Sequence, residues 1–144
     1  MTYDADADWA AVDGQLLGTP VTPGLDGALH FGSVDEFVRD YLRHVYKRRV
    51  DGRSRCWAAE WWRSEEAVVR LEALWRSWEA LRLDAATGMS EWFRDHADYH
   101  MGVLLDPDGP FAGATGDADT CRRGDPLPYA APPEAMFPDV RVAT

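Results

Sequence analysis

The chain has 144 residues, of which 46% are hydrophobic and 28% charged, with seven Trp, two Cys and a formal net charge of −10. This length and composition suit one folded domain and argue against disorder throughout, and two cysteines are too few for a small disulfide-stabilised secreted module. No apolar run approaches the roughly 20 residues of a membrane span, and the amino terminus lacks the basic and apolar regions of a signal peptide. We therefore expect a cytoplasmic protein with reduced thiols and no membrane partner.

The acidic residues are concentrated at the two ends of the chain. Residues 1–38 contain seven acidic residues and no Lys or Arg, whereas residues 39–94 contain twelve basic and nine acidic residues. Residues 95–144 contain three basic and nine acidic residues. Residues 1–32 are rich in Asp, Gly, Pro and Thr and lack helix or strand periodicity, which predicts an acidic flexible arm.

Three helices are expected within residues 33–105, which we interpret as a helical core domain. The first begins at the capping box formed by Ser33 and Glu36. Its apolar stripe, at 3.6 residues per turn, contains six residues: Val34, Phe37, Val38, Tyr41, Leu42 and Val45. The second helix runs from about Glu65 to Arg82, with Ser64 as its N-cap.

The third helix is predicted to begin near Ser90 and to end before Pro107, because proline disfavours helix at the residue that precedes it. Its inward stripe contains seven residues: Trp92, Phe93, His96, Tyr99, His100, Val103 and Leu104. Residues 106–144 are acidic and rich in Pro, which predicts turns and extended chain in a wrap or tail. The expected fold class is therefore mainly α, a small three-helix core with irregular Pro/Gly-rich N- and C-terminal extensions.

His96 and His100 are the first candidates for chemistry. Their spacing of four residues places both on one side of a helix, as in helical metal sites. Asp98 lies on the opposite side, and Ala97 stands where the zinc-protease motif has Glu. Histidines within an apolar stripe are also common as hydrogen-bonded core residues, so a structural role stays open.

The two cysteines extend this hypothesis. Cys56 and Cys121, together with His96 and His100, would form a Cys2His2 site for structural zinc, which is the one cofactor we consider. Neither cysteine has a second cysteine close by in sequence, so no zinc knuckle is present. A disulfide between them is the least favoured alternative in a reducing compartment.

A basic run is the second candidate. It contains seven residues: Arg39, Arg43, Lys47, Arg48, Arg49, Arg53 and Arg55. These bases would pair with the acidic flanks, contact nucleic-acid phosphates through residues 39–55, or bind an acidic protein partner. The net charge of −10 and a pI near 4.7 argue against nucleic acid. A further hypothesis is that the acidic arm covers this run until a ligand displaces it.

Six tryptophans lie between Trp57 and Trp92, and most of them are expected in the core. Trp61 and Trp62 are adjacent, so both cannot face inward from one helix. We therefore expect one of this pair on a groove or a partner surface, where it would stack on bases if the ligand were nucleic acid.

Several strings resemble a known bacterial family: Cys56-Trp-Ala-Ala-Glu-Trp-Trp-Arg-Ser-Glu-Glu-Ala67, Arg70-Leu-Glu-Ala-Leu-Trp-Arg-Ser-Trp-Glu79, Gly88-Met-Ser90, Trp92, Arg94-Asp-His-Ala-Asp98 and Gly109-Pro-Phe111. Over roughly residues 31–138 the chain is similar to domain of unknown function 4913, found in high-GC Gram-positive bacteria and on their plasmids and phages. Family members tend to carry His where Ser64 stands and Cys soon after the Gly-Pro-Phe string. This chain has Ala112-Gly-Ala114 at the latter place, which lowers the expectation of zinc.

We therefore expect a small accessory protein of a plasmid or phage setting that binds a macromolecular partner without catalysis. The predicted partner is a protein, with nucleic acid as the less favoured choice and a homodimer as a third. The predicted binding residues are Arg48, Arg49, Arg53, Arg55, Trp61 and Trp62. The alternative function is a metal-dependent enzyme or zinc-stabilised module that uses His96 and His100.

Overall fold

The computed structural model describes residues 28–141. They divide between a compact unit of residues 33–138 and a smaller unit that includes residues 28–32 and 139–141. In the smaller unit, the backbone N–H of Val140 donates to the carbonyl of Gly32 at 2.9 Å. Most of the predicted acidic arm, residues 1–32, lies outside the described residues.

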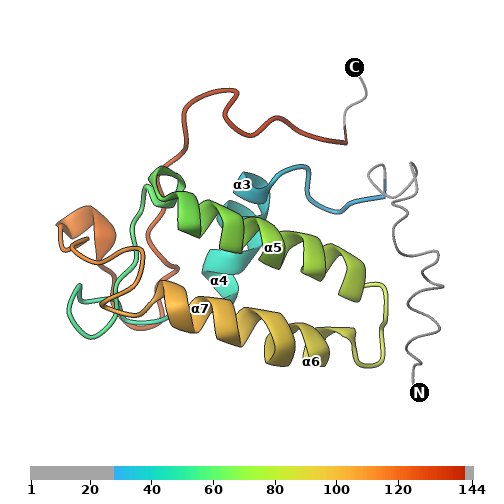
Figure 1. Cartoon of the computed structure of the whole chain (residues 1–144), viewed down its shortest axis with the longest axis horizontal. Helices are drawn as coiled ribbons and strands as arrows, with labels where there is room; N and C mark the ends of the chain where they lie inside the picture. Colours follow the sequence, from blue (N-terminus) through green and yellow to red (C-terminus); the bar gives the residue numbers. More distant parts are fainter. Residues whose placement is uncertain (1–27, 142–144) are drawn as a thin grey trace. The chain divides into compact units, whose positions relative to one another are not determined.

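The unit of residues 33–138 is built on three helical stretches. The first comprises α3 (Val34–Phe37), the π-helical turn η1 (Val38–Leu42) and α4 (Arg43–Val45). The second is α5 (Glu65–Leu81), and the third comprises α6 (Gly88–Trp92), the π-helical turn η3 (Phe93–Ala97) and α7 (Asp98–Leu104). In Figure 1, α5 lies beside the third stretch and runs antiparallel to it, and the first stretch crosses behind them. The predicted mainly α fold with a three-helix core is confirmed.

Local sequence signals place the helix starts. The side chain of Ser33 accepts a hydrogen bond from the backbone N–H of Glu36, and that of Ser64 accepts from Ala67, each at 3.1 Å. α5 begins and ends within one residue of the predicted bounds. Short 3-10 turns, η2 (Trp61–Arg63) and η4 (Asp117–Asp119), lie outside the three stretches.

The π-helical turn η3 changes which residues of the third stretch face the core. Its buried positions include Trp92, Ala97 and Met101. Ala97 lies five positions after Trp92, whereas one turn of an α-helix would place the next buried residue three or four positions later. A π turn closes i→i+5 hydrogen bonds and thereby adds one residue to the turn. The predicted inward stripe is therefore only partly correct beyond Trp92: Leu104 is fully buried, but His96 is only partly buried and Tyr99 is 63% exposed.

The turn η1 has the same effect in the first stretch. Phe37 and Leu42, five residues apart, are both fully buried, and Tyr46 is buried one α-helical turn later. Val45, predicted to face inward, is 37% exposed. The capping box predicts where this helix begins. Uniform 3.6-residue periodicity predicts the buried Val34, Phe37, Val38 and Leu42 but not the exposure of Val45.

Tryptophans fill the core, as the sequence predicts. Trp57, Trp61, Trp75 and Trp92 are almost completely buried. The indole of Trp92 donates to the carbonyl of Leu74 at 3.0 Å, and that of Trp75 to the carboxylate of Glu79 at 3.1 Å. Glu79 is itself buried and also accepts from Arg82 at 2.9 Å. A buried carboxylate is thus compensated by a neutral donor and a charged one.

The stretch after the third helix packs on the helices. Phe111 and Leu127 are buried, and the indole N–H of Trp57 donates to the carbonyl of Pro128 at 3.0 Å. The backbone N–H of Ala130 donates to the carbonyl of Ala59 at 3.0 Å. In Figure 1 the chain after η4 passes beside the start of α5. Residues 106–138 therefore supply apolar side chains to the core.

Candidate functional site

A tight loop presents the arginines that the sequence predicts for partner binding. One carboxylate oxygen of Asp51 accepts the backbone N–H groups of Arg53, Ser54 and Arg55 at 2.9, 2.8 and 3.2 Å. Gly52 has a φ of 80°, which is strained for residues with a Cβ. The backbone hydrogen bonds, that from Arg53 first, hold the pKa of Asp51 far below its ordinary value, so the carboxylate stays charged and keeps the loop closed.

A second arginine-containing segment lies against this loop. Val50 and Cys121 form an antiparallel bridge, with backbone hydrogen bonds of 3.0 and 3.1 Å. The thiol of Cys121 also donates to the carbonyl of Arg48 at 3.1 Å. The bridge brings together Arg residues that are distant in sequence. We call the resulting set the basic patch: Arg48, Arg49, Arg53, Arg55, Arg122 and Arg123.

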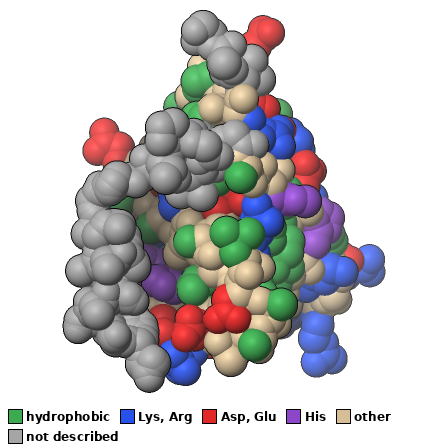
Figure 2. Space-filling model, turned by 90° about the vertical axis from the view of Figure 1, so that its right-hand side faces the viewer, with side chains coloured by type: hydrophobic (Ala, Val, Ile, Leu, Met, Phe, Trp, Pro, Cys, Tyr) green, Lys and Arg blue, Asp and Glu red, His purple; other side chains and the backbone are tan. Residues whose placement is uncertain are grey.

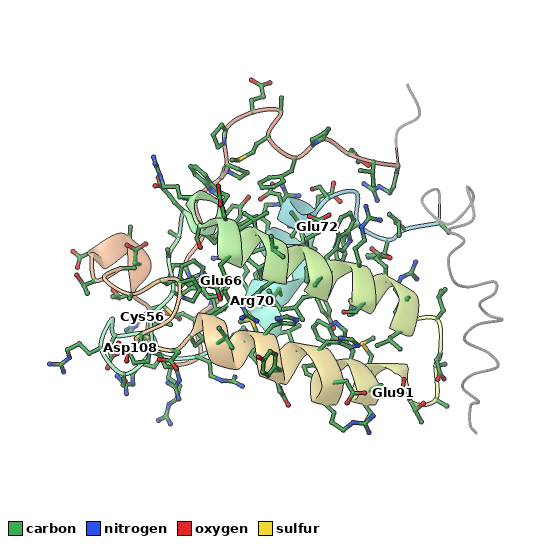
Figure 3. All side chains as sticks on the ribbon, viewed as in Figure 1. Cys56, Glu66, Arg70, Glu72, Glu91 and Asp108 are labelled. Carbon is green, nitrogen blue, oxygen red and sulfur yellow. The ribbon has the colours of Figure 1, made fainter. Side chains whose placement is uncertain are left out.

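Half of the basic patch lines a surface pocket of about 660 Å³. Arg49, Arg122 and Arg123 line it together with two carboxylates, Asp51 and Asp125. Arg49 pairs with Asp51 at 3.0 Å, and Arg122 approaches Asp125 at 3.6 Å although its side chain is 91% exposed. Figure 3 shows nitrogen-tipped side chains projecting at this end of the molecule, whereas the face in Figure 2 mixes acidic, basic and hydrophobic side chains. The pocket can offer guanidinium groups to an anionic ligand.

The sequence did not single out Arg122 and Arg123. They follow Cys121 in a stretch whose other charged residues are mostly acidic. A pair of adjacent arginines in an acidic stretch was the one signal for them. Only the bridge to Val50 shows that they join the basic run.

The predicted tryptophan surface is largely taken by the chain itself. Trp61 is fully buried, and its ring stacks on Phe137 with centroids 5.5 Å apart. Trp62 is partly buried, and its indole N–H donates to the carbonyl of Ala130 at 3.0 Å. Trp61 therefore offers no surface to a partner, and Trp62 offers only part of its ring.

The proposed zinc ligands are not assembled. Among residues 28–141, no three His, Cys, Asp or Glu side chains form a group that could hold a metal ion. Cys56 is buried, and burial raises the pKa of its thiol, which disfavours the thiolate that zinc requires. Cys121 is committed to the carbonyl of Arg48. The two cysteines and the two histidines are therefore not gathered into one metal site.

In the predicted histidine pair, one ring nitrogen of His100 is hydrogen-bonded to the guanidinium of Arg70. Nη1 of Arg70 lies 3.0 Å from Nδ1 of His100, and Nε of Arg70 lies 2.9 Å from a carboxylate oxygen of Glu66. Burial lowers the pKa of His100, with further contributions from Arg70 and His96. The neutral ring thus accepts from Arg70 at Nδ1, and the adjacent positive charge opposes a bound cation.

Comparisons with known proteins give a family and no function. No helix of the described residues is long and apolar enough to cross a membrane. Neither a curated protein nor a solved structure matches the chain. The family model described as domain of unknown function (DUF4913) matches residues 31–133, which contain the three helical stretches and the basic patch. Because this match covers well over half of the chain, the protein belongs to the DUF4913 family.

Proposed function

We propose that this domain is a small accessory binding module whose basic patch takes an acidic segment of a protein partner. The observation that supports this most directly is the Val50–Cys121 bridge, which joins two arginine-containing segments around one pocket. Guanidinium groups pair with carboxylates through two parallel hydrogen bonds, so an Asp- or Glu-rich segment suits this surface. The plasmid or phage setting belongs to the same proposal, and the genes beside this one test it.

A protein partner is favoured over nucleic acid for two reasons. Binding of single strands commonly adds stacking of bases on exposed aromatic rings, but Trp57 and Trp61 are buried and Trp62 is partly covered. The carboxylates of Asp51 and Asp125 also stand inside the patch and interrupt its positive charge, which suits the continuous row of phosphates in a nucleic-acid backbone less well than separate carboxylates of a peptide. A peptide can place its carboxylates against single guanidinium groups between Asp51 and Asp125.

Charge reversal tests the proposal. We expect a fluorescent peptide of Asp and Glu to bind the full chain, and the Arg122→Glu, Arg123→Glu variant to bind it about tenfold more weakly, since two surface ion pairs are lost. The matched control is Arg63→Glu, Arg94→Glu, which reverses two exposed arginines outside the patch. Fluorescence anisotropy at low and high salt measures both. Equal weakening by the control, or tighter binding of duplex DNA than of the peptide, would contradict the proposal.

A further inference from the structure

A second surface lies along the contact between α5 and α7, and its lining residues do not include the arginines of the basic patch. It holds two surface pockets, of about 470 and 620 Å³, that share Glu66. Val69, Arg70 and His100 line the first, and Asp98, Tyr99 and Asp108 line the second. Figure 3 shows Glu66 and Arg70 at the junction of the two helices. We call this surface the α5–α7 groove.

The groove exposes large apolar side chains. Val69 is 68% exposed and Tyr99 63%. Tyr99 is exposed because the turn η3 shifts the inner face of the third stretch by one residue. Arg70 lies over its ring at 5.8 Å, and the ring of His100 meets it edge-on at 5.5 Å, so Tyr99 is held in place although it is open to solvent. A fixed, exposed aromatic side chain and an exposed Val on one surface are typical of an interaction surface.

The charge of the groove is negative. Five carboxylates line its two pockets: Glu65, Glu66, Asp98, Asp106 and Asp108. Arg70 is the one Lys or Arg among the lining residues, and Glu66 neutralises it at 2.9 Å. His100 faces the groove as a neutral ring that accepts from Arg70. Nucleic acid and anionic lipid would therefore be repelled, and a cationic segment attracted.

We propose that the α5–α7 groove binds a basic segment of a protein partner, which covers Val69 and Tyr99 with an apolar side chain and sets Lys or Arg against the carboxylates. Charge complementarity selects this occupant. A second copy of this chain also carries a net charge of −10, so repulsion between the two whole chains opposes it. The charge of the groove is opposite in sign to that of the basic patch, so the two surfaces should bind different ligands. An experiment that refutes one proposal therefore leaves the other standing.

A pair of helical peptides tests the groove. The first is an amphipathic peptide of Leu and Lys, and the second has Glu in place of each Lys. Any binding of the Glu peptide belongs to the basic patch and should not change when the groove is altered. We expect the full chain to bind the Lys peptide, with affinity that falls at high salt, measured by fluorescence anisotropy. Val69→Ser, Tyr99→Ser should weaken it about tenfold, because two apolar anchors are lost. Both side chains are exposed, so the variant should keep its near-UV circular dichroism.

Matched controls separate the groove from general attraction to an acidic protein. Leu83→Ser removes an apolar side chain that is 65% exposed outside the groove, and it should leave binding unchanged. Glu65→Gln, Asp108→Asn should weaken binding more than Asp117→Asn, Glu134→Gln, which removes the same charge elsewhere. If the two double variants lose the same affinity for the Lys peptide, the proposal is overturned. A dimer in light scattering that Val69→Ser dissolves would also overturn it, because a second copy would then fill the groove.

Discussion

Arg70 connects three side chains that the sequence alone does not link. Its guanidinium pairs with Glu66, contacts the ring of His100 and lies over Tyr99. The Glu66–Arg70 pair is predictable from the i,i+4 spacing within α5. The contacts to α7 are not predictable from spacing, because they depend on how the two helices pack. The same packing buries part of His100 and makes the stability of the fold depend on its protonation.

The unfolding free energy should fall as the pH drops below about 6.5, because His100 is held neutral. Its pKa in the folded chain is below the ordinary value of 6.5, owing to burial first and then to Arg70 and His96. Between that lowered pKa and 6.5 the unfolded chain binds more protons, so protonation favours unfolding. Urea unfolding at a series of pH values measures this.

The control for this prediction is a second histidine. His100→Gln should flatten the dependence on pH between 7 and the lowered pKa, whereas His44→Gln, at an exposed position, should keep the wild-type dependence. An unchanged profile in His100→Gln would show that other groups cause the effect.

At the scale of elements, the π-helical turns decide which faces are buried. Amphipathic periodicity and capping residues predicted three helices and nearly all of their bounds. They did not predict the shift at η1 and η3, because a π turn is stabilised by packing on neighbouring helices rather than by a local sequence signal. In the third stretch the shift moves Ala97 and Met101 into the core and Tyr99 to the surface.

Deletion of Arg94 should be tolerated. The deletion places Ala97 four residues after Trp92, so an ordinary α-helical turn would keep the same side chains buried. Arg94 is exposed, and its ion pair with the neighbouring Asp95 is also exposed, so removing it should cost little stability. Circular dichroism and thermal unfolding should show a cooperative, folded variant.

Deletion of Gly102 is the matched control. Gly102 is exposed in α7, but no π turn follows it, and its loss rotates the buried Leu104 and Leu105 away from the core. Misplacing one buried leucine costs about 2–5 kcal/mol, which is a large part of the stability of a small domain. If both deletions unfold the chain equally, the explanation that η3 holds one extra residue in the third stretch is wrong.

At the scale of the whole unit, contacts between distant residues complete both the core and the candidate site. The Val50–Cys121 bridge places Arg122 and Arg123 beside the basic run. Leu127 is fully buried and makes two hydrogen bonds with Arg43. The backbone N–H of Leu127 donates to the carbonyl of Arg43 at 3.0 Å, and Nε of Arg43 donates to the carbonyl of Leu127 at 2.8 Å. The Pro-rich stretch is therefore part of the folded unit.

Leu127→Ala should lower the unfolding free energy by about 2–5 kcal/mol, because it leaves a cavity in the core. The same substitution at Leu83, which is 65% exposed, should change it by less than about 0.5 kcal/mol. Urea unfolding followed by tryptophan fluorescence compares the two. A small effect at Leu127 would show that the stretch contributes little to the core.

The sequence by itself determined the helical class, the helix starts, the burial of most tryptophans and four arginines of the basic patch, because caps, periodicity and side-chain hydrophobicity act over a few residues. The tertiary structure decided the rest. It covered Trp61 with Phe137, left the two cysteines and two histidines without a common metal site, and turned Tyr99 outward. It also brought Arg122 and Arg123 to the patch. These outcomes depend on contacts across tens of residues, and such contacts leave no periodic pattern in the chain.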